Sequence, residues 1–200
     1  MKKLLYFSCL FFLLFACTPS VTFNQPQPED VDSLTLFPKK LIGNYVNENG
    51  SSRLKIDHNC MTIFYDYDVK FSKESIGWDT IALAEQKKFV QDGDSVLENV
   101  NYCDTLFYIS EGNILKKYKG YYILNTIKDE NSWEVKNMKL QKGVLTIGSI
   151  SLKDELLNLE KIKESPIDTT TYNLQFTKKQ FGNYLKGESF KNKEIYFRIK

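Results

Sequence analysis

The feature that most constrains the fold is a regular alternation of apolar and polar side chains, which is the spacing of a half-buried β-strand. The clearest run covers residues 61–71, where one face carries Met61, Ile63, Tyr65, Tyr67, Val69 and Phe71. The other face carries Thr62, Asp66, Asp68 and Lys70, and Phe64 is an exception to the pattern. Such a strand must bury its apolar face against other elements, so the pattern predicts a β-rich domain.

Shorter alternating runs separated by turn residues predict hairpins along the rest of the chain. Residues 53–56 lead into the first long strand through the turn at 57–59. Further turns are predicted at 111–113, 129–131 and 141–143, between runs at 105–110, 114–118, 121–124, 133–140 and 144–150. The sequence does not decide the secondary structure of residues 79–103, because 82–90 tolerates a helix whereas 96–100 favours a strand.

Two helices and a final strand are expected in the C-terminal quarter. Ser151 and Asp154 form a capping box ahead of an apolar stripe, and Thr177 and Gln180 form a second one, whose helix ends at Gly187. The last strand covers 194–199. The predicted fold class is therefore mainly β: an antiparallel meander, arranged as a sandwich or an open barrel, with two short helices in the C-terminal quarter.

Residues 1–16 have the features of a removable signal peptide. Lys2 and Lys3 are followed by an uncharged run over 4–15. This run is too short to span a membrane, because its helical length of ~18 Å falls short of the ~30 Å hydrocarbon core. The sequence Leu14-Phe15-Ala16-Cys17 resembles the lipobox of bacterial lipoproteins. The resemblance implies that Cys17 becomes the lipidated first residue; the alternative is an ordinary signal peptide with a chance cysteine.

The same resemblance implies how and where the chain is anchored. More than one acyl chain on Cys17 gives stable attachment, since a single chain binds only marginally. Thr18, in place of Asp, favours the outer over the inner membrane by the enterobacterial sorting pattern. Residues 18–33 carry three prolines among polar residues, which predicts a flexible tether with a reach of about 50 Å. A single β-rich domain is expected over 34–200.

Charge argues against nucleic acid as a partner. Removing Lys2 and Lys3 with the signal peptide takes the basic count from 27 to 25, which equals the 25 acidic residues. A near-neutral domain lacks the basic excess of a nucleic-acid binder. Asp66 and Asp68 lack the surrounding oxygen ligands that a hard cation needs, and His58 lacks a partner for catalysis. No metal, cofactor or catalytic residue is therefore predicted.

Cys60 and Cys103 are the two cysteines left in the expected mature domain. One disulfide between them would close a loop of about 40 residues, worth ~4 kcal/mol in the chain-entropy model. Export would place both cysteines in an oxidising compartment, where a disulfide can persist. The alternative, two separate buried cysteines that pack as small hydrophobes, stays open.

Two short motifs add further resemblances. Residues 41–45, which end in Tyr45, are similar to the start of lipocalin-like lipoproteins, which typically have Trp there; this implies a barrel with an interior ligand site. Asp followed by Ser or Thr, then by an aliphatic residue or Thr, resembles the O-glycosylation sequon of Bacteroidota. This indicates a lipoprotein of Bacteroidota type, and the implied sites are Ser33, Thr80, Ser95, Thr105 and Thr169.

Three functions compete. The first is a lipid-anchored cell-envelope protein with a non-enzymatic binding or accessory role in an outer-membrane assembly, with an envelope protein or a glycan as partner. The alternative is a lipocalin-like carrier of a small apolar ligand, which requires a closed cavity lined by residues such as Tyr65 and Tyr67. The third is an enzyme, which requires a cleft that brings His58 to Asp66 or Asp68.

Overall fold

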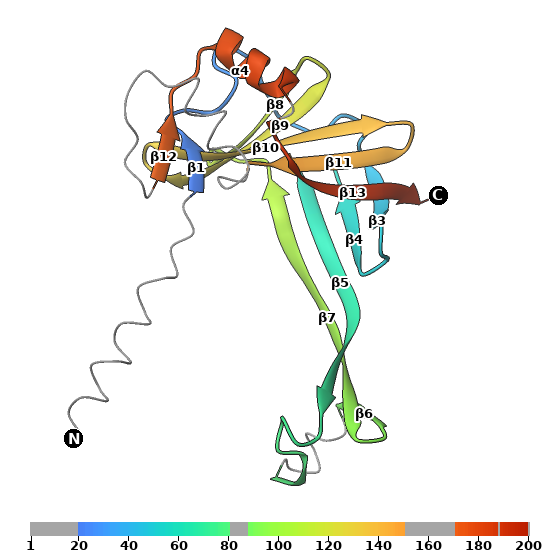
Figure 1. Cartoon of the computed structure of the whole chain (residues 1–200). Helices are drawn as coiled ribbons and strands as arrows, with labels where there is room; N and C mark the ends of the chain where they lie inside the picture. Colours follow the sequence, from blue (N-terminus) through green and yellow to red (C-terminus); the bar gives the residue numbers. More distant parts are fainter. Residues whose placement is uncertain (1–19, 81–87, 151–170, 188, 200) are drawn as a thin grey trace, which may run out of the picture. The chain divides into compact units, whose positions relative to one another are not determined.

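The structure is a computed structural model that describes residues 20–80, 88–150, 171–187 and 189–199 (Figure 1). Strands dominate these residues, and their antiparallel order is open at both ends, which confirms the mainly β class. The described residues form two compact units, and the single domain over 34–200 stays a prediction. The first, unit 1, comprises the described parts of Met1–Leu34, Glu111–Lys139 and Ile147–Lys193. Unit 2 comprises those of Thr35–Ser110, Leu140–Thr146 and Glu194–Lys200.

Unit 1 is built on the antiparallel strand order β2-β8-β9-β10. These strands are β2 (Ser33–Leu34), β8 (Asn113–Tyr118), β9 (Tyr121–Asp129) and β10 (Ser132–Gln141), of which β10 extends into unit 2. Strand β1 (Ser20–Phe23) meets β10 at Trp133 and pairs in parallel with β12 (Thr171–Leu174). Helix α4 (Lys178–Lys186) follows β12.

Unit 2 is built on the antiparallel strand order β13-β3-β4-β5-β7-β6. These strands are β3 (Gly43–Asn47), β4 (Ser52–Ile56), β5 (Cys60–Ser72), β6 (Phe89–Asp92), β7 (Ser95–Tyr108) and the later part of β13 (Asn192–Ile199). A short 3-10 helix, η2 (Trp78–Thr80), lies between β5 and β6. Strand β11 (Val144–Ser149), like β10 and β13, contributes residues to both units.

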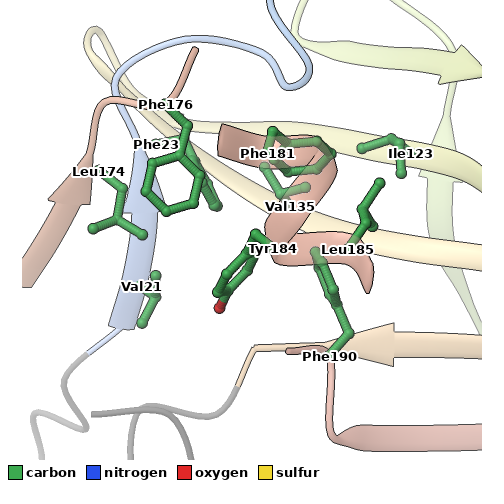
Figure 2. Packing of buried hydrophobic residues seen from close by; sticks show 10 residues of the cluster. All are labelled: Val21, Phe23, Ile123, Val135, Leu174, Phe176, Phe181, Tyr184, Leu185 and Phe190. Carbon is green, nitrogen blue, oxygen red and sulfur yellow. The ribbon is translucent and has the colours of Figure 1, made fainter. Parts of the chain in front are cut away.

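The N-terminal segment belongs to the core of unit 1, which corrects the predicted tether. Figure 2 shows Val21 and Phe23 of β1 packed with side chains of α4 and its neighbours. The Phe23 ring meets those of Phe176 and Phe181 edge to face, with centroids 5.5 Å and 6.0 Å apart. Sequence composition missed this, because only two apolar residues among many polar ones carry the packing. Residues 20–33 are therefore part of the folded unit rather than of a flexible tether.

Most of the predicted hairpins are confirmed. Strands β4 and β5 pair from Ile56↔Met61 onward, β9 pairs with β10, and β10 is next to β11. The hairpin predicted around 111–113 is wrong, because β7 pairs with β5 whereas β8 pairs with β9. At this point the chain leaves unit 2 after Ser110 and enters unit 1 at Glu111. A turn between two strands therefore does not show that they pair.

The end of the chain follows the sequence prediction where the structure describes it. Thr177 and Gln180 form the complete capping box of α4, and Gly187 lies at its C-terminal end. The last strand is β13. The helix predicted from Ser151 lies outside the described residues. Within 79–103, whose secondary structure the sequence left undecided, the structure has strands at 89–92 and from Ser95 onward.

The long β5 strand is buried along only part of its length. Met61 and Ile63 are buried as predicted, but Tyr67, on the same face, is 39% exposed. The reason is pairing: β4 accompanies β5 only as far as Ser52↔Tyr65, and beyond that point β5 is paired with β7 alone. The apolar alternation therefore continues past the core, onto a ribbon that presents side chains to solvent.

Candidate functional site

A polar pocket of about 540 Å³ opens on unit 2. Four strands bring its walls together, because Tyr196 of β13 is opposite Asn47 of β3, and Ser52 of β4 is opposite Tyr65 of β5. Most of the lining side chains carry a hydrogen-bonding group. The lining residues are Asn47, Glu48, Asn49, Ser51, Ser52, Ile63, Tyr65, Glu194, Ile195 and Tyr196.

The turn between β3 and β4 supplies amide and hydroxyl groups in a fixed arrangement. Asn47 donates from Nδ2 to Ser51 Oγ at 3.1 Å, and its Oδ1 accepts from the backbone N–H of Ser52 at 3.0 Å. Asn49 Oδ1 accepts from the Ser51 hydroxyl at 2.6 Å and from the Ser51 backbone N–H at 3.0 Å. Gly50 closes the turn with a φ of +77°, a conformation that favours glycine. These bonds hold the polar rim of the pocket in place before any ligand binds.

Tyr196 and Glu194 form the opposite wall. The Tyr196 hydroxyl donates to Glu194 Oε2 at 2.7 Å, and the tyrosine is only 2% exposed. Burial, followed by the hydrogen bond to this carboxylate, raises the pKa of Tyr196 well above its usual range. The hydroxyl therefore stays protonated and the Glu194 carboxylate stays oriented. The carboxylate presents its remaining acceptor capacity to the pocket.

An aromatic surface borders the pocket. The rings of Tyr65 and Tyr102 stack with centroids 4.6 Å apart and an interplanar angle of 20°. Burial, and then the neighbouring Tyr102, raise the pKa of Tyr65. Tyr102 itself is 48% exposed, and Tyr67 lies two residues beyond Tyr65 on the same face of β5. The flat rings extend the binding surface away from the polar rim.

The composition of this pocket determines which kinds of molecule it could accommodate. Amide and hydroxyl groups both donate and accept hydrogen bonds, whereas the carboxylates of Glu48 and Glu194 only accept them. None of the ten lining residues is basic. Tyrosine rings offer an apolar face with a polar tip. A ring-shaped, hydroxyl-rich molecule without negative charge meets all three conditions.

The residues considered for catalysis from sequence are not brought together. His58 is exposed in the turn between β4 and β5 and does not line the pocket. Asp66 and Asp68 are exposed on β5, where Asn99 Nδ2 donates to both carboxylates at 3.3 Å and 3.1 Å. Arg53 lies 3.9 Å from Asp66. Within the described ranges, no three His, Cys, Asp or Glu side chains form a group that could hold a metal ion.

The possible disulfide between Cys60 and Cys103 is not formed: both cysteines are free, Cys60 is half-buried and Cys103 is exposed. The strand register explains why: Cys60 is opposite Tyr108, whereas Cys103 is opposite Phe64, four residues further along β5. At about 3.3 Å per residue this separates the two cysteines by ~13 Å, well beyond the ~7 Å between Cα atoms that a disulfide tolerates. The predicted strand began at residue 105, whereas β7 begins at Ser95, so Cys103 lies well inside a strand.

The predicted glycosylation sites are distributed over both units. Ser33, Thr80 and Thr105 are exposed, while Ser95 is half-buried at the start of β7. Thr169 lies outside the described residues, as do the signal segment 1–16 and Cys17. Modification at these positions stays a prediction.

The pocket residues were only partly visible in the sequence. Tyr65 belonged to the alternating face of the predicted long strand, but Asn47, Asn49 and Glu194 were not singled out. The available signal was the polar cluster Asn47-Glu48-Asn49-Gly50 between two strand-like runs, which is typical of a turn. Glu194 had no such signal, because only the pairing of β13 with β3 brings it to this turn.

Comparison with known proteins adds no relative. No protein-family model matches the chain, and no curated protein or solved structure matches it either. Of the helices in the described part of the chain, none is long and apolar enough to cross a membrane.

Proposed function

We propose that this protein is a lipid-anchored binding protein of the cell envelope, held in the outer membrane through Cys17, and that its pocket in unit 2 binds a saccharide. One observation carries the proposal: a pre-formed rim of amide and hydroxyl groups lies beside a stacked tyrosine pair. The lipobox-like sequence before Cys17 supports the anchor. The proposed partner is thus a glycan of the cell's own surface or surroundings.

The arrangement of the pocket favours binding over catalysis. The Ser51 hydroxyl is bonded to Asn49, and the Tyr196 hydroxyl to Glu194, so these groups serve to orient one another. Neither hydroxyl has a histidine or lysine among the lining residues that would activate it as a nucleophile. A pocket of this kind recognises its ligand by hydrogen bonds and ring contacts.

The geometry of unit 2 does not favour the lipocalin-like carrier. That function needs strands closed around a largely apolar cavity. The strand order of unit 2 is open, and the pocket is lined mainly by polar side chains. Tyr65 lines it, but Tyr67 does not.

Titration calorimetry with neutral, amino and acidic oligosaccharides tests the proposal, with a long-chain fatty acid as the carrier control. We expect neutral or amino sugars to bind and acidic sugars to bind at least tenfold more weakly, because Glu48 and Glu194 repel an anion. Tyr65→Ala and Asn49→Ala should each weaken binding about tenfold, at a cost of ~1.4 kcal/mol.

The matched control is Tyr108→Ala, which removes a tyrosine that is exposed on β7 but does not line the pocket. It should leave the affinity unchanged. Binding of the fatty acid without any oligosaccharide would favour the carrier function instead. Equal binding by wild type, Tyr65→Ala and Asn49→Ala would show that this pocket is not the site.

A further inference from the structure

Strand β7 has an unpaired edge. It pairs with β5 along its whole length, from Ser72↔Ser95 to Cys60↔Tyr108. On its other side, β6 accompanies it only from Ser95 to Glu98. Beyond Glu98, no strand within the described ranges pairs with this side of β7 (Figure 1). In the part of the chain that the structure describes, the backbone N–H and C=O groups on this side of residues 99–104 therefore have no strand partner, whereas the Thr105 N–H donates to Asp104 Oδ1 at 2.7 Å.

Residues 99–105 lack most of the features that normally prevent pairing at an edge. Monomeric proteins protect such edges with lysine, proline, inward-pointing charges or β-bulges, and of these only a bulge is present, at the end of the edge near Leu106. Residues 99–108 contain no lysine, arginine or proline, and Asp104 is their one charged residue. Tyr102, Leu106 and Tyr108 are 48%, 37% and 49% exposed. An unprotected edge with exposed apolar side chains is typical of a strand that pairs with a partner.

We propose that this edge pairs antiparallel with the β7 edge of a second copy of the chain, with Cys103 at the two-fold axis. The inference does not depend on the proposed saccharide site. Symmetric pairing of one edge with itself gives a closed dimer, because both free edges are used at once.

The charge pattern of the strand favours this register. With Cys103 at the axis, Asp104 is opposite Tyr102 of the second copy, and a tyrosine hydroxyl can donate to a carboxylate. Asn101 is then opposite Thr105, two side chains that can hydrogen-bond across the strands. A two-fold axis at Asp104 would instead place two carboxylates directly opposite each other, which destabilises a pair. With the two-fold axis at Cys103, the side chains of one β7 edge therefore face complementary side chains of the second copy.

The irregularity near the end of β7 sets the limit of the pairing. The register shifts at Met61/Thr62, where Thr62 is opposite Thr105 and Met61 is opposite Phe107. Leu106 is therefore an extra residue, as in a β-bulge, and its side chain is exposed. A bulge bends the strand and ends regular pairing, so the regular part of the edge runs from Asn99 to Thr105, around Cys103.

Thiol crosslinking of the full chain tests the proposal, in a Cys60→Ser background so that Cys103 is the reactive thiol of the described residues. A short bis-maleimide should link two copies through Cys103, and Cys103→Ser should abolish the product. Mass spectrometry of the purified chain confirms that Thr105 is unmodified, since a sugar there would block the edge.

Charge variants then test the register itself. Asn101→Lys combined with Thr105→Lys places like charges opposite each other twice in the dimer, and should reduce the crosslinked dimer about tenfold or more. Asn101→Asp combined with Thr105→Lys places opposite charges there and should restore the dimer. Both double variants add charges at exposed positions of one chain, and circular dichroism and thermal unfolding verify that both are folded.

The outcomes separate the alternatives. The proposal is supported if the wild type gives a crosslinked dimer, the double-lysine variant (the lysine pair) does not, and the aspartate–lysine variant gives it again. It is overturned if the wild type gives no dimer, or if the lysine pair crosslinks as well as the wild type. It is equally overturned if the opposite charges fail to restore the dimer, or if the thiol captures a different protein, which would make the edge a docking strand for that protein.

Discussion

Two buried polar side chains hold the N-terminal segment in place at the residue scale. The Asn125 carboxamide accepts from the backbone N–H of Gln27 at 2.6 Å and donates to the Gln27 carbonyl at 2.9 Å. Lys116 Nζ donates to the carbonyls of Pro26 and Pro28 at 3.0 Å and 2.8 Å. Burial lowers the pKa of Lys116, although the nearby Asp30 and Glu29 oppose this shift. These side chains provide hydrogen-bond partners for buried backbone groups of residues 26–28, which are not paired in a strand.

Replacing Asn125 should therefore be costly. Asn125→Ala leaves the buried N–H and carbonyl of Gln27 without their partner, and should lower the free energy of unfolding by about 2–4 kcal/mol. The control is Asn173→Ala, because Asn173 also donates to a backbone carbonyl, that of Asn131, but is exposed. Its effect should stay within about 0.5 kcal/mol. Denaturant unfolding measures both, and equal losses would contradict the role of Asn125.

The tyrosine in the pocket wall predicts a loss of stability in alkali. Burial and Glu194 raise the pKa of Tyr196, so the folded protein keeps this proton above pH 10, where the unfolded chain releases it. The resulting stability is fully present below pH 10 and is lost as the pH rises through the folded pKa. Tyr196→Phe should unfold with a shallower dependence on pH above 10. Tyr108→Phe, at an exposed position, is the control, and identical slopes for all three proteins would refute the expectation.

At the scale of elements, sequence alternation predicted strands better than their partners. The 53–56 and 61–71 runs form a hairpin because their connecting turn is short and both strands belong to unit 2. Lys119-Gly120 and Lys142-Gly143, which both have positive φ at each residue, provide two-residue turns of the kind that hairpins favour. The pairing of β7 with β5 joins residues that are between 23 positions (Ser72↔Ser95) and 48 positions (Cys60↔Tyr108) apart, and no local pattern encodes it.

Strand β1 is the element whose importance the sequence most concealed. Phe23 is fully buried against Phe176 and Phe181, so Phe23→Ala should destabilise unit 1 by about 3–5 kcal/mol. Ile127→Ala, at a partly exposed position of β9 in the same unit, should cost less than about 1 kcal/mol. Amide hydrogen exchange of α4 and β9 reads out unit 1 directly. Unchanged protection in Phe23→Ala would show that β1 is dispensable.

At the scale of the whole molecule, the long-range assembly of the chain limits what its sequence reveals. The mainly β class and the cap of α4 depend on short-range patterns, and both were predicted correctly. The two units are assembled from three segments each, so neither their number nor their membership follows from local composition. The pocket depends on the same long-range pairing, since Glu194 and Asn49 are far apart in the chain. The sequence analysis could identify Tyr65 because it belongs to the apolar alternation of its own strand.

Truncation tests this organisation. A chain that begins at Leu34 omits only the residues that the sequence predicts to be signal peptide and tether. It nevertheless lacks β1 and the segment held by Asn125 and Lys116. We expect it to lose protection in α4 and β9, which pack in unit 1, while a chain that begins at Ser20 keeps it. Limited proteolysis followed by mass spectrometry compares the two. If the shorter chain resists proteolysis as well as the longer one, residues 20–33 are not part of the folded unit.

The anchor itself is tested by Cys17→Ala. If Cys17 carries the lipid, the variant should leave the membrane fraction and appear either as uncleaved precursor or as released protein, because the acyl chains supply the membrane affinity. Metabolic labelling with a fatty acid should mark the wild type only, and Cys103→Ser is the control that keeps both the label and the membrane association.

Only two residues separate Cys17 from the start of β1 at Ser20. At about 3.6 Å per residue these can span little more than 10 Å, so unit 1 should stay close to the headgroups rather than about 50 Å away. Label on Cys17→Ala, or its retention in the membrane fraction, would refute the anchor.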